Sequence, residues 1–271
     1  MPLTDLQARM LRILAAGRSP ESYLAGATVL HRSDDSPRFS QDLDFFHDVA
    51  DSVARCAEAD AKTLLTADID FEWLLRTPTF YRAVVSVGGE KLKLEWAQDS
   101  AFRFFPVQAD DFCGYRLHDA DAAVNKILAL AGREEIRDFV DILHLHRTYL
   151  SVGALAWSAC GKDPGYSPAF LLDHAGRHVK YSQDHLDRLH LREPLGVANL
   201  KRQWLTAVEQ AQGLIESLPE ADLGCLYLTS EGVPVTPEPN GIRFRDLCRH
   251  FGSVRGAWPL IAPYCDDSSR G

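Results

Sequence analysis

The most constraining feature of this sequence is a change in the spacing of its apolar residues near Asp119. Between residues 22 and 117, apolar and polar residues alternate in short runs that turn residues interrupt, which is typical of half-buried strands. From about Asp119 to Leu218, apolar residues recur every three or four positions, which indicates amphipathic helices. Because strands and helices follow one another in blocks, the sequence predicts an α+β protein, with a small mixed sheet and flanking helices followed by a helical domain.

The same change divides the chain into three expected parts. Residues 1–117 would form a core that contains the sheet, residues 118–218 a helical domain, and residues 219–271 a turn-rich C-terminal appendage. The appendage is expected to be irregular because residues 230–241 include three prolines and two glycines. One short helix is expected in it, at residues 244–251.

Composition excludes several classes of protein. The chain has 271 residues, of which 46% are hydrophobic and 25% charged, as in ordinary globular domains. No apolar run approaches the roughly 18 residues that a membrane-spanning helix needs, so we expect a cytoplasmic protein without membrane contact. The formal net charge of −9 argues against sequence-independent coating of nucleic acid, but it is compatible with a local basic site.

The N-terminus and the cysteines are consistent with this location. Asp5 and Arg9 interrupt the apolar positions of the first residues, so these predict an amphipathic helix, capped by Thr4 and Gln7, and no signal peptide. Six cysteines are scattered without a CxxC pair and are expected to be reduced.

Local patterns predict the strands and helices that could carry a site. The expected strands are residues 42–46, 67–74, 82–87 and 91–96. The last two would form a hairpin around a Gly88-Gly89 turn. The expected helices are residues 121–131, 136–143 and about 200–218, with Gly132 as the break between the first two.

Asp42 and Asp44 are the first candidates for a chemical role. They are two positions apart on an expected strand, so both carboxylates should project from the same face. Two close carboxylates repel one another, and a divalent cation between them relieves that repulsion. The alternative is a solvated strand edge that carries two acids without binding a metal.

Gly26 and Thr28 lie upstream of this pair. Gly26 would let the backbone approach a phosphate closely, the N-terminus of a following helix would supply free amide donors, and Thr28 would add a hydroxyl. A phosphate site beside a metal-binding pair of aspartates is what phosphoryl or nucleotidyl transfer requires.

A third acid lies on the second arm of the expected hairpin. Lys91, Lys93 and Glu95 should share one face of that strand, with Leu92 and Leu94 on the other. Glu95 could complete a metal site or accept the proton of an attacking hydroxyl, and the lysines would suit a triphosphate or an RNA backbone. Ordinary charge alternation on a half-exposed strand is the alternative.

These residues together resemble a known family. Gly26-Ala-Thr28 with Ser40-Gln-Asp-Leu-Asp-Phe-Phe46 resembles the first motif of the AbiEii/AbiGii-type nucleotidyltransferases, a branch of the polymerase-β-like superfamily known mostly as type IV toxins. The later family signature is matched by Lys126 to Arg133 and by Arg137-Asp-Phe-Val-Asp-Ile142. The resemblance covers residues 20–147 and implies a polymerase-β-like nucleotidyltransferase core at residues 1–117.

The resemblance also implies roles for individual residues. Asp42 and Asp44 would hold two Mg²⁺ ions, Glu95 would be the third catalytic carboxylate, and Lys126 would neutralise the triphosphate. The residues that would line the β- and γ-phosphates are Gly26, Ala27, Thr28 and Ser40. The further basic residues expected to bind the nucleotide are Lys93, Arg133 and Arg137. If one helix continues through Gly132, Lys126 would share its face with Arg133 and Arg137.

The chain departs from the family at three points. The gap from Gly26 to Asp42 is sixteen residues, longer than in many members of the superfamily. Ala27 stands where a second Gly or Ser is usual, and the last 120 residues match no motif, so the acceptor lies outside the resemblance. The implied function is transfer of NMP from an NTP to an acceptor, with RNA or tRNA favoured, by a toxin whose antitoxin is encoded nearby. The alternatives are modification of a small molecule such as an antibiotic, and a nucleotide-binding or interaction module without turnover.

Three other charged groups need an interpretation. Asp68 and Asp70 repeat the pattern of paired aspartates but have no glycine loop nearby, so we expect surface acids. Asp138 and Asp141 are expected to pair with Arg133 or Arg137, with Arg137–Asp141 at helical i, i+4 spacing, in preference to binding metal. A basic cluster in the appendage is either a solvated surface or an RNA contact; it comprises Arg243, Arg245, Arg249 and Arg255.

Overall fold

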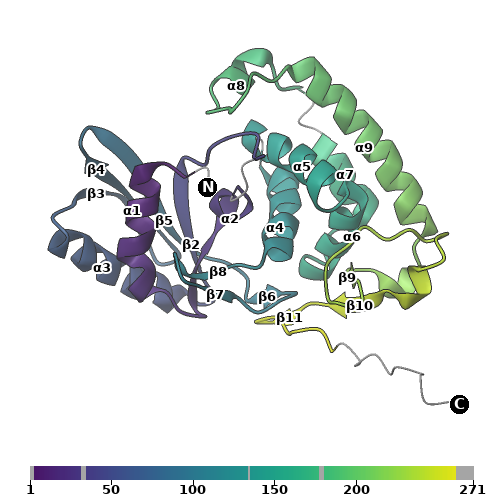
Figure 1. Cartoon of the computed structure of the whole chain (residues 1–271), viewed down its shortest axis with the longest axis horizontal. Coiled ribbons are helices and arrows are strands. Elements are labelled where there is room, and N and C mark those ends of the chain that lie inside the picture. The colour runs from purple at the N-terminus through teal and green to yellow at the C-terminus, as the bar shows by residue number, and fades with distance from the viewer. Residues whose placement is uncertain (1–2, 32–34, 134, 177–179, 261–271) are drawn as a thin grey trace, which may run out of the picture.

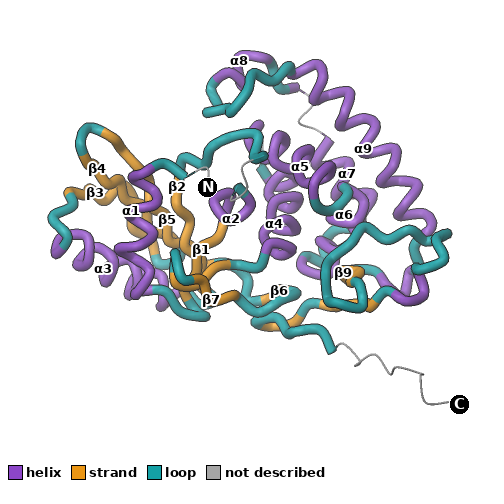
Figure 2. Tube along the Cα trace, viewed as in Figure 1, coloured by secondary structure: helices purple, strands orange, loops and turns teal. Residues whose placement is uncertain are grey.

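The computed structural model describes residues 3–31, 35–133, 135–176 and 180–260. A seven-stranded mixed sheet occupies one side of the molecule, and a group of helices occupies the other (Figures 1 and 2). The α+β class predicted from the change in periodicity is therefore confirmed. Within the described ranges, every helix is too short or too polar to span a membrane.

The sheet is built around two parallel strands. In chain order its strands are β1 Ser22–Ala25, β2 Asp42–His47, β3 Asp70–Thr77, β4 Phe80–Val87, β5 Glu90–Gln98, β7 Gln108–Asp110 and β8 Gly114–Arg116. Across the sheet the order is β3-β4-β5-β2-β1-β8-β7. The central pair β2 and β5 is parallel, whereas β4 pairs with β5, and β1 with β2, in antiparallel fashion.

The sequence predictions for the strands hold with one shift. The strand at residues 42–46 is β2, and the hairpin around Gly88-Gly89 is formed by β4 and β5. The strand expected at residues 67–74 begins later, at Asp70, because the preceding helix continues to Thr66 and Asp68 turns the chain with φ of 56°. Leu92 and Leu94 are buried while Lys91 is exposed, as the alternation on β5 predicted.

Nine α-helices lie within the described residues. They are α1 Asp5–Leu14, α2 Gly26–Leu30, α3 Ala50–Thr66, α4 Asp119–Gly132, α5 Ile136–Thr148, α6 Val152–Lys162, α7 Pro168–Gly176, α8 Gln183–Asp187 and α9 Val197–Ser217. Helices α1 and α3 pack against the sheet, where they cover the buried side chains of β5. Thr4 and Gln7 form the predicted capping box at the start of α1.

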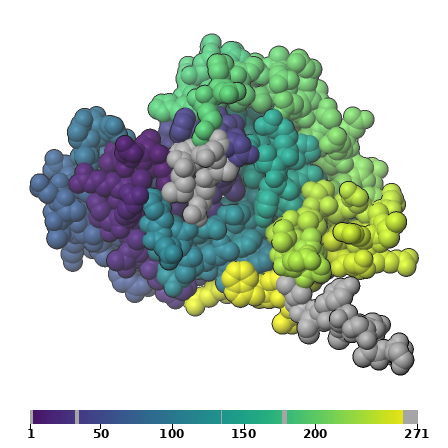
Figure 3. Space-filling view, viewed as in Figure 1, coloured from purple at the N-terminus to yellow at the C-terminus, as the bar shows by residue number. Residues whose placement is uncertain are grey.

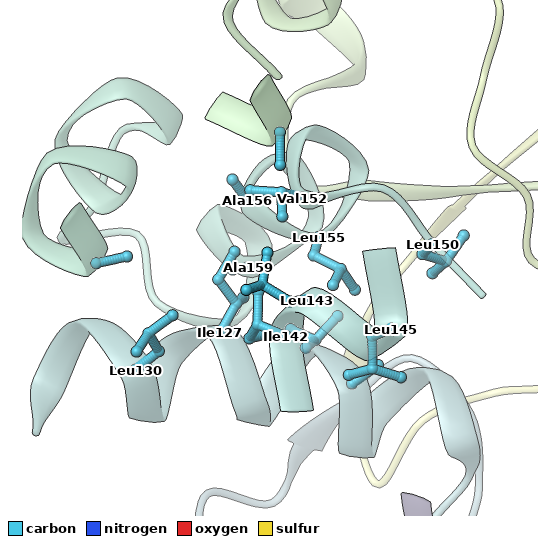
Figure 4. Close-up of a cluster of buried hydrophobic side chains, with 14 of the residues drawn as sticks. Ile127, Leu130, Ile142, Leu143, Leu145, Leu150, Val152, Leu155, Ala156 and Ala159 are labelled. Carbon is cyan, nitrogen blue, oxygen red and sulfur yellow. The ribbon is translucent and has the colours of Figure 1, made fainter. Parts of the chain in front are cut away.

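Helix α4 is the centre of the helical group, because α2, α5, α6 and α7 all pack against it. Its apolar side chains Ile127 and Leu130 meet Ile142 and Leu143 of α5 and Leu155 of α6 (Figure 4). This cluster and the one beneath the sheet are the two largest groups of buried apolar side chains in the described chain. The domain boundaries at residues 117 and 218 stay a prediction.

The C-terminal segment differs from its prediction. Residues 244–251 do not form a helix: Phe244–Asp246 is a single 3₁₀ turn, and β10, Cys248–Phe251, pairs with β9, Cys225–Leu228. Strand β11, Ser253–Val254, then pairs with β6, Phe102–Arg103, so the segment returns to the sheet side of the molecule. Figure 3 shows this segment in yellow along the lower face. The five cysteines among the described residues are free, as expected, and Cys265 lies outside that part.

Candidate active site

Asp42 and Asp44 lie on the face of β2 that points away from α3, with Asp42 at the first position of the strand. The parallel register of β2 and β5 sets Asp44 directly opposite Glu95, and Asp42 opposite Lys93. Cross-strand partners share a face of the sheet, so the structure brings Asp42, Asp44 and Glu95 together, as the sequence predicted.

The carboxylate of Asp44 lies in an electrostatically unfavourable place. Burial, followed by the negative charges of Glu95 and Asp42, raises the pKa of Asp44 to about 6, against the opposing effect of Lys126 and Arg137. A raised carboxylate pKa at a cluster of acids is typical of a functional site. This cluster therefore has the charge imbalance that a bound cation would relieve.

Basic side chains partly neutralise the other two carboxylates. Lys93 Nζ lies 2.8 Å from Asp42 Oδ1, and Arg137 Nη1 donates to Asp42 Oδ2 over 3.2 Å. Arg82 Nε, on the neighbouring strand β4, donates to Glu95 Oε1 over 2.8 Å. Lys93 is 43% exposed at its side chain, so its ammonium can leave Asp42 without opening the core.

Gly26 begins α2 directly beside Asp44. Its φ of +67° lies in the left-handed region that glycine adopts most easily. A Cβ atom at this position would lie 1.9 Å from Asp44 Oδ2, which no side chain could do without displacing the carboxylate. Gly26 is therefore required here by the close approach of the backbone to Asp44, in addition to the predicted phosphate contact.

The hydroxyls of Thr28 and Ser40 are occupied within the protein. Both donate to the carbonyl oxygen of Asp42, over 3.0 and 3.1 Å, and both side chains are buried. Gln7 of α1 holds Ser40 in turn, because its Nε2 donates to the Ser40 carbonyl over 2.9 Å. The structure thus gives these two hydroxyls a positioning contact to the first residue of β2, while their predicted contact with phosphates stays a prediction.

Lys126 lies in a buried ion pair next to the carboxylates. Its Nζ is 2.8 Å from Asp138 Oδ1 and 3.0 Å from Asp141 Oδ2. Arg133 Nε donates to Asp138 Oδ2 over 2.8 Å, so the predicted pairing of Asp138 with Arg133 is confirmed. Only 6% of the Lys126 side chain is exposed, whereas Arg133 is half exposed and open to a ligand.

The break predicted at Gly132 is confirmed, because α4 ends there and Arg133 is extended, with φ of −143°. Lys126, Arg133 and Arg137 therefore do not share a helix face, which would have required one continuous helix. The expected pairing of Arg137 with Asp141 is wrong, because the Arg137 guanidinium donates to Asp42. The physical reason is that Asp42 has only Lys93 as another basic partner among the described residues, whereas Asp141 already has three.

Those partners of Asp141 include residues that the sequence analysis missed. Arg38 donates to both carboxylate oxygens, with Nε 2.7 Å from Oδ1 and Nη2 2.6 Å from Oδ2, and His31 Nε2 lies 2.9 Å from Oδ1. Burial alone would raise the pKa of Asp141, but Arg38, His31 and Lys126 hold this pKa well below its usual range. Arg38 is 103 residues from Asp141, and no local signal pairs them.

The donor set of the cluster suits a hard divalent cation. Carboxylate oxygens are the ligands that Mg²⁺ prefers, and the negative charges of Glu95 and Asp42 add to burial in raising the pKa of Asp44. In the described part of the chain, no three acidic, histidine or cysteine side chains are gathered closely enough to enclose a metal ion. The Asp42 carboxylate faces Lys93 and Arg137 instead, so it must turn from them to ligate a cation.

A cavity of about 280 Å³ opens at the far end of the β2 face that carries Asp42 and Asp44. It is bordered by Gly26 and by Phe46, which follows Asp44 on the same face of β2. Its cationic side chains are Lys126, Arg133 and Lys162. Asp99 also lines the cavity, with its Oδ2 3.6 Å from Lys162 Nζ. A small cavity next to Gly26 in which three cations outnumber one carboxylate suits the phosphates of a nucleotide.

The other charged groups lie apart from the site. Asp68 and Asp70 are exposed at the start of the outer strand β3, in agreement with the reading as surface acids. Two of the four arginines of the C-terminal cluster are engaged in ion pairs within the protein. Arg249 pairs with Asp222 over 3.2 Å and stacks on Phe244, and Arg255 pairs with Glu21 over 2.8 Å.

Comparison with known families identifies a nucleotidyltransferase. The chain belongs to the nucleotidyl transferase AbiEii toxin family of type IV toxin–antitoxin systems, whose family model matches residues 10–215. Membership implies a nucleotide substrate and an antitoxin partner. The resemblance drawn from residues 20–147 is thereby confirmed, and the match extends through α9.

Solved structures share the fold. A Helicobacter pylori structure described as a candidate nucleotidyltransferase is 18% identical and superposes with a TM-score of 0.50, over 80% of this chain and 100% of that one. MenT4, a nucleotidyltransferase toxin from Mycobacterium tuberculosis, is 16% identical with a TM-score of 0.57, over 80% of this chain and 83% of that one. The comparison with curated protein sequences gave no match.

Proposed function

We propose that this nucleotidyltransferase moves NMP from an NTP to a hydroxyl of RNA, with tRNA favoured, and releases pyrophosphate in a Mg²⁺-dependent reaction. The observation that carries the proposal is the set of three carboxylates, Asp42, Asp44 and Glu95, on adjacent parallel strands beside Gly26. The toxin family supports the class of reaction, and the acceptor is taken from the resemblance to type IV toxins.

Asp42, Asp44 and Glu95 would hold two Mg²⁺ ions. Bound there, Mg²⁺ would lower the pKa of the acceptor hydroxyl and stabilise the charge that develops on the α-phosphate. A bound cation is supported by the closeness of the three carboxylates, because the triphosphate, a further negative group, would otherwise add to the repulsion between them.

In the transfer step, the acceptor oxygen attacks the α-phosphorus. The bond from this phosphorus to the oxygen that bridges it to the β-phosphate breaks, and pyrophosphate leaves with the bonding electrons. Glu95 accepts the proton of the acceptor hydroxyl, and Arg82 orients its carboxylate from the neighbouring strand. The positive charges around the cavity then stabilise the leaving pyrophosphate.

The residues around that cavity divide into two groups. Arg133 and Arg137 would contact the phosphates directly, since about half and a third of their side chains are exposed. Lys126 would act electrostatically from its buried position beside Asp138 and Asp141. The backbone of Gly26 and Ala27, the hydroxyls of Thr28 and Ser40, and Lys93 complete the proposed nucleotide contacts.

The acceptor class is tested by following the label from α-³²P-NTPs. The purified protein is incubated with each of the four NTPs and Mg²⁺, together with total tRNA or with a mixture of small hydroxylated compounds such as aminoglycosides. Radioactivity in RNA on a denaturing gel is the expected result. Label in a small compound, with none in RNA, contradicts the proposed acceptor and favours the small-molecule alternative.

A further inference from the structure

A second, larger cavity lies at the end of β2 opposite the cationic one. It has a volume of about 730 Å³ and lies where β2 and β5 begin. The side chains that matter for its chemistry are Phe39, Ser40, Lys91, Leu92, Lys93 and His190. Its wall therefore combines apolar and aromatic surface with two lysines and one carboxylate, that of Glu90.

The two cavities lie at opposite ends of the carboxylate pair. Along β2, Ser40 at the larger cavity comes two residues before Asp42, and Phe46 at the cationic cavity comes two residues after Asp44. A strand advances about 3.3 Å per residue, so Asp42 and Phe46 lie roughly 13 Å apart along β2, and Ser40 precedes the strand at its Asp42 end. Two ligands, one bound in each cavity, could therefore meet at Asp42 and Asp44.

In-line transfer requires this arrangement. The attacking oxygen and the leaving pyrophosphate lie on opposite sides of the α-phosphorus. Lys126, Arg133 and Lys162 make the smaller cavity the site for the leaving phosphates. The acceptor must then approach from the side of the larger cavity, where Lys93 bridges the cavity wall and Asp42.

The loop that carries Phe39 is held in place by two other parts of the chain, the segment at residues 190–192 and α5. The Phe39 amide donates to the His190 carbonyl over 2.9 Å, and the Arg192 amide donates to the Pro37 carbonyl over 3.0 Å. The neighbouring Arg38 is fixed by its two bonds to Asp141. A site on a fixed loop loses little conformational entropy when a ligand binds.

Phe39 is suited to contact a nucleobase. Its ring is partly exposed, and the Arg192 guanidinium lies 5.4 Å from the ring centroid, which adds a cation to an aromatic surface. Aromatic rings flanked by basic side chains are how proteins hold unpaired nucleotides, by stacking on the base and by attraction to the backbone. Lys91, which is exposed at the rim, can supply that attraction.

We infer that this cavity binds the terminal, unpaired nucleoside of the RNA acceptor, with its base stacked on Phe39 and the adjoining phosphate at Lys91. The inference rests on the proposed function, because it assumes RNA as the acceptor. It assigns acceptor recognition to a surface made by the loop at residues 37–41, the start of β5 and the segment at residues 190–192.

The test compares variants at the cavity with matched variants elsewhere. Phe39→Ala and Lys91→Ala remove the proposed contacts, and Phe39→Trp keeps a stacking surface. The controls are Phe170→Ala, a half-exposed phenylalanine on α7, and Lys62→Ala, an exposed lysine on α3. KM is measured separately for the RNA acceptor and for the NTP, and folding is checked by circular dichroism.

We expect Phe39→Ala to raise KM for RNA about tenfold, as for loss of one stacked base, and to leave KM for the NTP unchanged. In Phe39→Trp, KM for RNA should be close to that of the wild-type protein. Lys91→Ala should raise KM for RNA less and reduce its salt dependence. A rise in KM for the NTP alone assigns the cavity to the incoming base and overturns the inference. An unchanged KM for RNA in Phe39→Ala and Lys91→Ala also overturns it.

A photocrosslink separates failure of this inference from failure of the proposed function. A short single-stranded RNA with 5-iodouridine at its 3′ end is irradiated with the wild-type protein, and the crosslinked residue is identified by mass spectrometry. A crosslink at Phe39 or His190 supports the cavity even if no NMP is transferred to RNA. Transfer to RNA with crosslinks only at other surfaces supports the function and contradicts the cavity.

Discussion

Gly26 lies so close to Asp44 that a Cβ atom on Gly26 would come within 1.9 Å of Asp44 Oδ2. The first motif of the site and its second carboxylate are therefore in direct steric contact, although 18 residues separate them in the chain. Any side chain at position 26 would move the Asp44 carboxylate, and with it the cluster that it forms with Asp42 and Glu95.

We predict from this contact that Gly26→Ala abolishes nucleotide transfer while the protein still folds. Alanine at a positive φ costs about 1–2 kcal/mol of stability, and the displaced carboxylate can no longer share a cation with Asp42. Gly213→Ala in the interior of α9, where a Cβ meets nothing within 4 Å, is the matched control. It should stabilise the protein by about 0.5–1 kcal/mol and leave transfer unchanged. Full transfer by Gly26→Ala contradicts the proposed geometry.

The buried pair of Arg38 and Asp141 gives a prediction about stability. Arg38→Ala leaves Asp141 buried with a reduced set of partners, so the free energy of unfolding should fall by about 3–5 kcal/mol. Arg76→Ala is the control, because the Arg76–Glu58 pair has a similar distance of 2.7 Å but is half exposed. It should change stability by at most about 1 kcal/mol in urea denaturation. Equal losses in the two variants refute the assigned role of Arg38.

His118 provides a prediction about pH. Burial lowers the pKa of His118 to about 4, so the folded protein takes up this proton less readily than the unfolded chain. This pKa difference adds to the free energy of unfolding above the ordinary histidine pKa of about 6.5, and its contribution is lost as the pH falls towards about 4. Asn can keep the N-cap that His118 provides for α4 but does not titrate. In His118→Asn, the unfolding midpoint should therefore fall less than in wild type between these pH values. Parallel pH profiles would show that His118 does not contribute.

The C-terminal arginines lead to a prediction about RNA. The sequence left open whether they contact RNA, but Arg249 and Arg255 are paired with Asp222 and Glu21 in the structure. We therefore expect Arg245→Glu to leave the affinity for RNA and its dependence on salt unchanged, measured by fluorescence anisotropy. A reduced affinity with a shallower salt slope would instead show that the exposed Arg245 belongs to an RNA contact.

Local patterns were enough to find the carboxylates, because each depends on a short stretch of chain. Strict alternation put Asp42 and Asp44 on one face of β2, and the Gly88-Gly89 turn fixed the arm that carries Glu95. The parallel pairing of β2 with β5 then brought the two strands together. No local signal predicts that register, which the order of family motifs supplied indirectly.

The basic side of the site was harder to predict, because its partners are distant in sequence. Lys126, Arg133 and the end of α4 at Gly132 were predicted, but the contacts of Lys126 with Asp138 and Asp141 emerge only when α4 packs on α5. The role of Arg38 depends on its ion pair with Asp141, which lies 103 residues away in the sequence. Similarly, β10 forms a strand only because β9, some 20 residues earlier, offers it a partner.

The most direct test of the account compares four single variants in the transfer assay, with folding checked by circular dichroism. Asp42→Asn and Asp44→Asn remove charges that would hold Mg²⁺, so each should reduce transfer about a hundredfold or more. Asp68→Asn and Asp70→Asn change exposed acids on the chain before and at β3, and each should retain wild-type transfer with stability within about 0.5 kcal/mol. Loss of transfer at Asp68 and Asp70, with Asp42 and Asp44 variants still active, would contradict the assignment of the active site.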